Sequence, residues 1–522
     1  MRGSASPLRF LPMAAQLYSA KTAIVCGKKR FTYLEYQLRA NRLANGLRRV
    51  GVQKGDRVAY LGYNCHTLLE AYYGVVQAGA VLMPLNIRLV AGDFALMLNH
   101  AGARTIVVHE DFIPVIDSIR DGLPAMRDYV AVSAGPVEGY LDYEDLLRAA
   151  SPEHYVDPLM REDDVAELFY TSGTTGKPKG VMLSHRNLYA NAVNFLLSLD
   201  LKSTDVLLHT IPLFHVNGWG TPHALTYVGG THVVIPRFDA RRVLELVERE
   251  KVSMCCMVPT MVNALVNTPE IASRDLASLK KLVVGGASSP EALVEAVEQK
   301  IGCTYIGSYG LTEASPVVTN SVLKEHLHNL PPAGRHRLQA KAGLPVVGVE
   351  VRVVDENGRE VRHDGQQAGE VLVRGDTVMT GYWHDEEETA RVVVDGWLRT
   401  GDMATVDEEG YLKIVDRKKD IIVSGGENIS SLEVENVLYT HPAVLEAAVV
   451  GDPDEHWGEV AKAFVVLKPN VPPVSAQEIK DFCRTRLAGF KVPRRVEFVT
   501  ALPKSGTGKI MKSLLKRGRS QV

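Results

Sequence analysis

Between residues 31 and 50, leucines recur at the spacing that places them on one face of a helix. A short apolar run over residues 58–61 follows a Lys-Gly-Asp turn and predicts a buried strand. The same order of helix and then strand recurs along the chain, which is typical of parallel sheets covered by helices on both faces. The further predicted pairs span residues 68–78 and 81–85, 94–101 and 105–108, 243–251 and 252–258, and 290–300 and 304–306.

The pattern changes after Gly348. Residues 349–354 alternate between apolar and polar, and the Asn-Gly pair at residues 357–358 is a strong hairpin signal before a second strand at residues 370–374. Beyond Asp416, helices and strands mix. A capping box from Ser430 to Glu433 predicts a helix to about Thr440. Strands are predicted at residues 447–451 and 461–467, and a further helix at residues 476–487.

These patterns predict an α/β fold with two domains, and 522 residues are enough for two or three. The large N-terminal domain, residues 1–415, is expected to consist of layered parallel β-sheets with helices. It ends in a small β subdomain at about residues 345–415. A small α+β C-terminal domain is expected over residues 416–522.

The composition narrows the class of protein. The 59 Lys and Arg residues nearly balance the 61 Asp and Glu residues, which argues against a nucleic-acid surface. No apolar segment approaches the roughly 18 residues of a membrane span. Cys255 and Cys256 lie in an apolar run and are expected to be buried, reduced thiols of a cytoplasmic protein. The basic N-terminus lacks acidic residues before Glu35, as in transit peptides, but the predicted fold begins near residue 14.

A loop rich in glycine, hydroxyl groups and lysine occupies residues 170–180, directly after the apolar run at residues 165–169. Glycines let backbone N–H groups approach a polyanion, hydroxyls add donors, and lysines add positive charge. We therefore predict a phosphate-binding loop, with a flexible surface loop as the alternative. It is not the usual mononucleotide loop, because Thr171 and Pro178 stand where that motif needs glycine and Ser or Thr.

This loop resembles the signature of the adenylate-forming superfamily, which includes acyl-CoA synthetases, luciferases and the adenylation domains of peptide synthetases. Four further motifs agree, in the order of that family, so the resemblance covers nearly the whole chain. They lie at residues 309–316, 397–402, 416–428 and 503–509.

The resemblance implies that ATP converts a carboxylate, a poor acyl donor, into an acyl-adenylate in a site that excludes water. Thr312 and Glu313 match the positions that contact the α-phosphate and hold Mg²⁺, a metal usually bound by one carboxylate together with phosphates. A residue stabilised at a helix start is the alternative for Glu313. The loop residues that match the grip on the β- and γ-phosphates are Thr171, Ser172, Gly173, Thr174, Thr175, Gly176 and Lys177.

The resemblance also assigns the nucleoside contacts. Tyr309 matches the aromatic residue that stacks on adenine, and Gly285, Gly286 and Ala287 match the backbone beside adenine and the acyl carboxylate. Asp402 matches the carboxylate that takes both ribose hydroxyls, and Arg417 matches a second ribose contact. Without the flanking motifs, an isolated Asp or Arg would be read as a surface residue.

The C-terminal domain is implied to be mobile, with a hinge at Asp416. Lys509 matches the catalytic lysine that stabilises charge during adenylation and is then moved away, whereas Lys504 and Lys512 are expected to be ordinary surface charges. The turn at Gly425 matches a segment that lines the CoA thiol channel in the second step.

His215 matches the residue beside the acyl channel of acyl-CoA synthetases, and residues 217–219 are expected to shape the pocket; a core histidine is the alternative. His209, His223 and His232 lack metal-ligand spacing and receive no role.

The resemblance is greatest to free-standing fatty acyl-CoA synthetases, since the chain stops soon after Lys509. The predicted function is ATP-dependent ligation of a short- to medium-chain fatty acid to CoA, with long chains as an extension. The alternatives are an aryl-acid–CoA ligase, a luciferase-like enzyme, and a nucleotide-binding regulator without turnover, which the presence of Lys509 and Glu313 disfavours. Relatives often form homodimers, and the sequence leaves the oligomeric state open.

Overall fold

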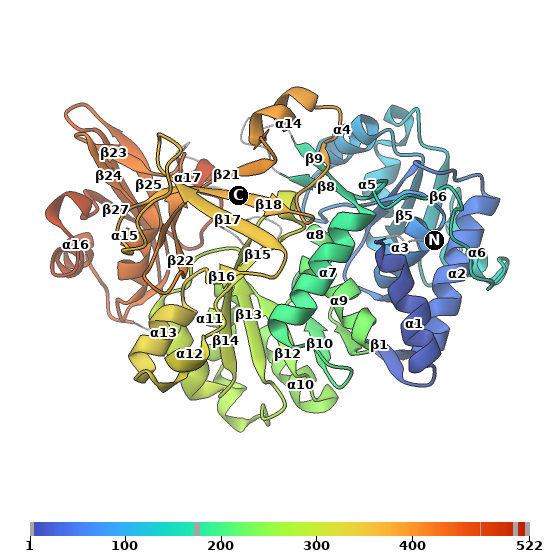
Figure 1. Ribbon diagram of the computed structural model, residues 1–522, viewed down its shortest axis with the longest axis horizontal. Coiled ribbons are helices and arrows are strands. Elements are labelled where there is room, and N and C mark those ends of the chain that lie inside the picture. The colour runs from blue at the N-terminus through green and yellow to red at the C-terminus, as the bar shows by residue number, and fades with distance from the viewer. Residues whose placement is uncertain (1–4, 172–177, 470, 505–509, 517–522) are drawn as a thin grey trace.

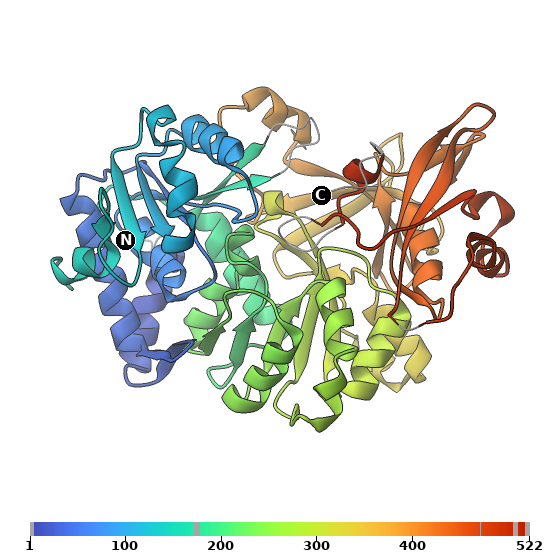
Figure 2. The same ribbon diagram turned by 180° about the vertical axis from the view of Figure 1, so that it is seen from behind.

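The computed structural model describes residues 5–171, 178–469, 471–504 and 510–516. Within these ranges the strands form four sheets. Figures 1 and 2 show the N-terminal part of the chain at one end of the molecule and the part that follows Asp416 at the other. The predicted α/β architecture is confirmed.

One mainly parallel sheet of eight strands has the order β19-β9-β8-β4-β3-β5-β6-β7. Parallel pairing runs through the middle of this sheet, and β9 returns antiparallel to β8. The strands are β3 (Arg57–Leu61), β4 (Val81–Pro84), β5 (Thr105–His109), β6 (Asp128–Val132), β7 (Leu141–Asp142), β8 (Val165–Thr171), β9 (Lys179–Ser184) and β19 (Gly381–Tyr382).

A second sheet of nine strands has the order β16-β15-β14-β13-β12-β10-β11-β1-β2. Six parallel strands are flanked by antiparallel strands at both edges. The strands are β1 (Thr22–Cys26), β2 (Lys29–Thr32), β10 (Val206–His209), β11 (Thr231–Val234), β12 (Met254–Met257), β13 (Lys281–Gly285), β14 (Thr304–Gly310), β15 (Val317–Asn320) and β16 (Leu344–Pro345).

Helices cover these two sheets, including at the five places where apolar spacing predicted them. The Thr32 side chain caps the first long helix, and Glu35 completes its capping box. Burying one apolar face of each helix against a sheet is the main source of their stability. The helices are α2 (Tyr33–Arg49), α3 (His66–Gln77), α4 (Ala91–Ala101), α7 (His185–Leu199), α8 (Val216–Trp219), α9 (Thr221–Val228), α10 (Ala240–Glu250), α11 (Pro259–Val266) and α12 (Glu291–Lys300).

The third sheet is formed by strands between Val349 and Arg417, in the region where the β subdomain was predicted. β17 (Val349–Val354) and β18 (Gly369–Gly375) form an antiparallel pair, and the predicted Asn-Gly turn lies in the connection between them, where it brings Glu360 back beside Val354. β21 (Trp397–Val406) and β22 (Leu412–Arg417) extend it, so it ends one residue beyond Asp416. One segment of the subdomain leaves it, because β19 pairs with β9 of the eight-stranded sheet.

The C-terminal residues form a fourth sheet with its own apolar core, which includes Val434, Ala447 and Ile479. Ser430 caps α15 (Ser431–Tyr439) through the backbone N–H of Glu433, as the sequence predicted. The other elements are β23 (Ile422–Ser424), β24 (Glu427–Ile429), β25 (Val444–Asp454), β26 (Gly458–Leu467), α16 (Ala476–Arg484), β27 (Arg495–Phe498) and α17 (Lys512–Lys516).

Two expectations from composition agree with the structure. Cys255 and Cys256 are buried and free, and burial raises the pKa of Cys256 to about 12. Across the described ranges, every helix is too short or too polar to cross a membrane.

Candidate active site

A large cavity of about 2530 Å³ lies where the nine-stranded sheet, the third sheet and the C-terminal residues meet. The loops after β13 and β14 open into it, as expected for parallel sheets, whose ligands bind beyond the carboxyl ends of the strands. Nearly all predicted site residues within the described ranges line this cavity. They are Thr171, His215, Gly286, Ala287, Tyr309, Thr312, Glu313, Asp402 and Arg417.

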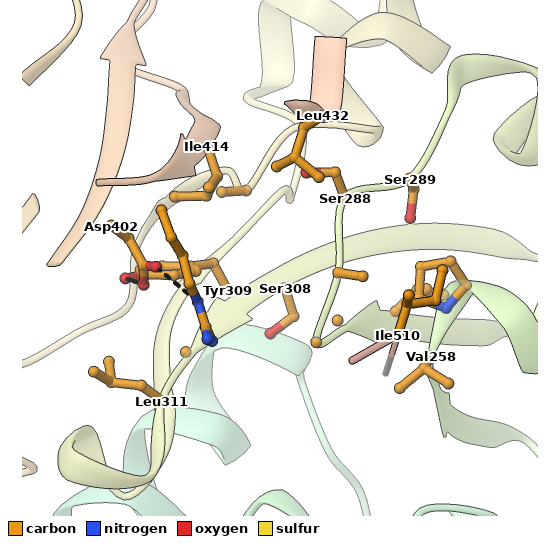
Figure 3. Close-up of a pocket in the computed structure, with 18 of the residues that line it drawn as sticks. Val258, Ser288, Ser289, Ser308, Tyr309, Leu311, Asp402, Ile414, Leu432 and Ile510 are labelled. Carbon is orange, nitrogen blue, oxygen red and sulfur yellow. Dashed lines mark hydrogen bonds and ion pairs between the residues drawn. The ribbon is translucent and has the colours of Figure 1, made fainter. Parts of the chain in front are cut away.

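Tyr309 and Asp402 are in direct contact on one side of the cavity (Figure 3). The Tyr309 hydroxyl donates a hydrogen bond of 2.7 Å to Asp402 Oδ2. Burial, and then the nearby Asp402 carboxylate, raise the pKa of Tyr309 well above its usual value, so the phenol stays protonated. Arg417 pairs with Asp402 in the β21–β22 register, and its Nε lies 3.5 Å from Asp402 Oδ1. Three residues from distant motifs therefore form one cluster.

Thr312 and Glu313 lie in a short helical turn that follows β14 and lines the cavity. Glu313 is oriented by a residue that sequence reasoning missed, because the Tyr382 hydroxyl donates a 2.9 Å hydrogen bond to Glu313 Oε1. The Met379 backbone N–H also donates to the Glu313 carbonyl oxygen at 2.8 Å. Glu313 is thus fixed from β19, 69 residues further along the chain.

The far end of the predicted phosphate-binding loop is also fixed. Lys179, at the start of β9, forms an ion pair with Glu388 and lies 5.1 Å from the ring centroid of Tyr382. Hydrogen bonds from Arg391, and then from Lys179, lower the pKa of Glu388 to about 2. Ser172, Gly173, Thr174, Thr175, Gly176 and Lys177 lie outside the described residues, as does Lys509.

Another side of the cavity is apolar. Phe214, Val216, Trp219 and Val258 line it and are buried. Trp219 packs so closely on Gly285 that a Cβ added there would lie 3.2 Å from its indole and 2.6 Å from the Ser308 carbonyl oxygen. Figure 3 shows Val258 and Ile510 on the opposite side of Ser308 from Asp402. The cavity therefore has a polar region at Asp402 and a separate apolar region.

Backbone strain gathers beside the apolar region. Val216 and Trp219 have φ values of +42° and +66°, in the left-handed region that a β-branched residue such as valine rarely adopts. Such strain persists only where the surroundings enforce it, and it clusters at functional sites. His215 lies at the start of this strained segment and lines the cavity half-buried, which fits its predicted place beside an acyl group.

His209, His223 and His232 are buried and do not line the cavity. His209 Nε2 lies 2.9 Å from His232 Nδ1, and His232 Nε2 lies 3.0 Å from Thr226 Oγ1. His223 Nε2 lies 3.1 Å from Glu167 Oε1. Burial lowers the pKa of His209 to about 3 and holds that of His232 well below its usual value. Each of these three side chains has a partner within the core, and no role was predicted for them from the sequence.

The C-terminal residues contribute the remaining side of the cavity, through Ile510, Met511, Lys512 and Ser513. The expectation that Lys512 is an ordinary surface charge is wrong. Its side chain is 14% exposed and lies 2.8 Å from the buried carboxylate of Glu435. Lys504 is also paired, with Glu446. Both contacts join residues far apart in sequence, so local pattern could not reveal them.

Gly425 does not line the cavity in this arrangement. It lies at the β23–β24 turn with φ of +58°, and a Cβ added there would lie 2.6 Å from Trp457 Cε3. The turn itself therefore requires glycine at this position. The contact of Gly425 with CoA stays a prediction.

The cavity suits Mg²⁺ bound through phosphates better than a metal held by protein alone. No three His, Cys, Asp or Glu side chains in the described ranges gather into a metal-binding group. Glu313, an oriented carboxylate on the cavity wall, is the donor type that Mg²⁺ takes alongside substrate phosphates.

Comparison with known proteins identifies the family of this chain. The family model described as AMP-binding enzyme matches residues 11–383, and the model described as AMP-binding enzyme C-terminal domain matches residues 433–509.

Individual relatives align over almost the entire chain. A long-chain-fatty-acid–CoA ligase of Thermus thermophilus is 40% identical over 97% of this chain and 94% of its own length. A feruloyl-CoA synthase of an Amycolatopsis species is also 40% identical, over 96% of this chain and 97% of its own. A crystal structure of an anthranilate CoA ligase with anthranoyl-AMP superposes with a TM-score of 0.92 at 31% identity, covering 99% of this chain and 98% of that one.

Proposed function

The chain belongs to the AMP-binding enzyme family and is an ATP-dependent acid–CoA ligase, and from this premise we propose that its acid substrate is a fatty acid of short to medium chain length. The observation that carries the proposal is the apolar region formed by Phe214, Val216, Trp219 and Val258 beside Gly285 and Gly286. An alkyl tail buried there gains up to about 0.8 kcal/mol for each methylene, or roughly fourfold in kcat/KM.

The indole of Trp219 argues for limited pocket depth. It packs directly on Gly285 and is 7% exposed, so it occupies volume that a longer chain would need. We expect the gain per methylene to end at medium length, and we expect Trp219→Ala to move the optimum to longer acids.

Adenylation is the first of two proposed steps. Asp402 and Arg417 hold the ribose, Tyr309 supports adenine, and Thr312 contacts the α-phosphate. Glu313 would hold Mg²⁺, whose charge would offset that of the phosphates. The phosphate-binding loop from Thr171 to Lys177 and the catalytic Lys509 supply the remaining positive and donor groups. The acid's carboxylate, held beside Gly286, Ala287 and His215, attacks the α-phosphate and displaces pyrophosphate, and the buried apolar wall keeps water from the mixed anhydride.

Thioesterification is the second step. The CoA thiol loses its proton, and its sulfur bonds to the acyl carbon as the bond from that carbon to AMP breaks. The thiol must therefore reach the centre that the C-terminal residues approach during adenylation. A single arrangement of residues 416–522 would therefore obstruct one of the two steps. We propose that this domain turns at Asp416 between them and that the Gly425 turn then approaches the thiol channel.

Aryl-acid ligation is the second candidate. The feruloyl-CoA synthase relative and the anthranilate ligase structure favour it, because both act on aromatic acids by name. An aromatic ring could lie against the Trp219 indole in the same apolar region.

A panel of acids separates these candidates. ATP–pyrophosphate exchange and CoA thioester formation are measured for straight-chain acids from two to sixteen carbons and for benzoate, cinnamate and ferulate. We expect kcat/KM to rise along the aliphatic series and peak at short to medium length. A flat aliphatic response together with strong activity on the aromatic acids would replace this proposal with the second candidate. The cytoplasmic location and the homodimer stay predictions that this panel does not address.

A further inference from the structure

A buried polar network joins three segments at the edge of the cavity. It consists of Asp416 on β22, Ser431 and Glu435 on α15, and Lys512 on α17, and is called the α15 network here. Asp416 Oδ2 accepts hydrogen bonds from the Ser431 backbone N–H and hydroxyl, both at 2.7 Å. Lys512 Nζ lies 2.5 Å from Ser431 Oγ and 2.8 Å from Glu435 Oε1. Ser431 therefore links the carboxylate of Asp416 to the ammonium of Lys512.

The α15 network is too deeply buried to be a chance surface contact. Asp416 is 2% exposed, Ser431 0% and Glu435 6%. Glu435 also accepts a 2.7 Å hydrogen bond from the backbone N–H of Val449 in β25. Burial raises the pKa of Glu435, and the charge of Lys512 opposes that rise. Removing one member of such a group leaves a buried charge or donor unpaired, so these contacts are costly to break singly.

The network crosses the boundary at which the proposed domain movement occurs. Asp416 belongs to the third sheet, where it lies opposite Met403, whereas Ser431 and Glu435 belong to the C-terminal part of the chain. The Asp416–Ser431 contact therefore spans the proposed hinge, and the Glu435–Lys512 ion pair lies on its C-terminal side. Figures 1 and 2 both show α17 between the third sheet and the strands of the fourth.

Lys512 is also part of the segment that closes the cavity. Ile510, Met511 and Ser513 line the cavity beside it, and the backbone N–H of Met511 donates to the Pro503 carbonyl oxygen at 2.8 Å. In the sequence, Lys509 stands three positions before Lys512. A contact that fixes α17 against α15, and α15 against Asp416, therefore also constrains where the catalytic segment can lie.

We propose that Asp416, Ser431, Glu435 and Lys512 are positioning residues for adenylation, which together hold the C-terminal segment against the cavity until the domain turns for thioesterification. This inference rests on the proposed two-step function. The Asp416–Ser431 hydrogen bonds are the part that the movement must break, and the Glu435–Lys512 pair is the part that moves as a unit.

The test measures the two half-reactions separately in Ser431→Ala, Glu435→Gln, Lys512→Met and the double variant Glu435→Gln/Lys512→Met. ATP–pyrophosphate exchange reports adenylation. Thioester formation from supplied acyl-adenylate and CoA reports the second step. Misplacing a reacting group by about 1 Å costs up to roughly 100-fold, so each single variant should lose about 10- to 100-fold in exchange. The second step should stay within about twofold of the unaltered enzyme.

The double variant distinguishes positioning from direct catalysis. Members of one network show non-additive effects, so the double variant should lose little more than the worse single variant. The contrary result is that only Lys512→Met lowers exchange strongly and that the loss in the double variant equals the two single losses combined. Lys512 would then act on the substrates itself, and the proposal would be overturned.

Lys516→Met is the matched control, because Lys516 lies on the same helix but makes a longer, 3.5 Å ion pair with Asp420 and is 31% exposed. Both half-reactions should be unchanged in it.

Equal loss of both half-reactions together with lowered Tm in the network variants would show a merely structural role. Ser431→Ala, which removes a single hydroxyl, tests the proposal even if Lys512→Met does not fold. If the unaltered enzyme performs neither half-reaction with any acid, the proposed function fails; if it performs both and the variants match it, only this inference fails.

Discussion

The two sides of the cavity hold their residues in different ways. Gly285 and Tyr309 lie at the ends of β13 and β14, and Thr312 follows β14; both strands pair with neighbours on both sides, so the nine-stranded sheet sets the positions of these residues. Lys512 and Ile510 belong to a short C-terminal segment held by a few side-chain contacts and an isolated bridge from Lys504 to Ile510. One side is therefore fixed, and the other is attached by contacts that can be exchanged. This difference suits a site that must carry out two successive reactions on one acyl group.

Glu313→Gln should cause the largest loss on the sheet side. The amide keeps the shape and can still accept the Tyr382 hydrogen bond, but it loses the charge that Mg²⁺ needs. Losing one electrostatic contact made in the transition state costs roughly 100- to 1000-fold, and pyrophosphate exchange should fall by that amount. Glu409→Gln, at a surface carboxylate paired with Lys324, is the control. A loss below about tenfold in Glu313→Gln would contradict the assignment.

Asp402→Asn tests the nucleoside cluster on the same side. A hydrogen bond to a charged group contributes about 1.5–3 kcal/mol, so KM for ATP should rise roughly 10- to 100-fold, with a smaller change in kcat. Tyr309→Phe keeps the ring and removes only the donor to Asp402, so its effect should be smaller. Kinetics at varied ATP concentration give both values. An unchanged KM in Asp402→Asn would remove this residue from the ribose site.

Tyr382→Phe addresses the orientation of Glu313. Removing a residue that orients a metal ligand costs about 10-fold or more in metal affinity, so the Mg²⁺ concentration for half-maximal ATP binding should rise several-fold to about tenfold. Calorimetric titration of ATP at graded Mg²⁺ concentrations measures it without turnover. The Tm should change little, and a fall in Tm with unaltered Mg²⁺ dependence would show that Tyr382 acts only in packing.

The last of these predictions concerns the acid stability of the sheet side. Burial lowers the pKa of His209 to about 3, against about 6.5 unfolded. Burial first, and then the charges of His209, His223 and Lys21, hold the pKa of His232 well below its usual value. Below pH 6.5 these two histidines bind protons in the unfolded chain but not in the folded chain. The free energy of unfolding therefore falls as pH drops from 6.5 toward 3, by up to about 1.4 kcal/mol per pH unit for each histidine. Urea unfolding at several pH values should show a shallower dependence in His209→Asn. His456→Asn, at an exposed histidine of the C-terminal part, should leave the slope nearly unchanged, and an identical slope in all three proteins would refute the account.

Local sequence pattern predicted most of the framework. Apolar spacing located α2, α3, β3 and β4 within a few residues, because each of these elements buries one face or a continuous run against the core. The positions after β8, β13 and β14 were predicted as site loops, since strand ends in parallel sheets gather at one edge. β19 was missed as a member of the eight-stranded sheet, because two residues carry no periodic signal.

Contacts between distant segments could not be predicted in the same way. Nothing near Tyr382 or Glu313 in the sequence indicates that they meet. For Glu435 a signal was present. Ser431, Val434, Glu435 and Leu438 recur at the spacing of one buried helical face, and all four are buried. A glutamate in such a stripe implies a buried cationic partner, and Lys512 proved to be that partner.

The central claim is that the sheet side serves both half-reactions while the C-terminal side, as placed here, serves adenylation. Lys509→Ala tests it most directly, with pyrophosphate exchange measured beside thioester formation from supplied acyl-adenylate and CoA. The account predicts a loss of about 100-fold or more in exchange, with ATP binding and thioester formation nearly unchanged. Near-normal exchange, or an equal loss of both half-reactions in a folded protein, would contradict it.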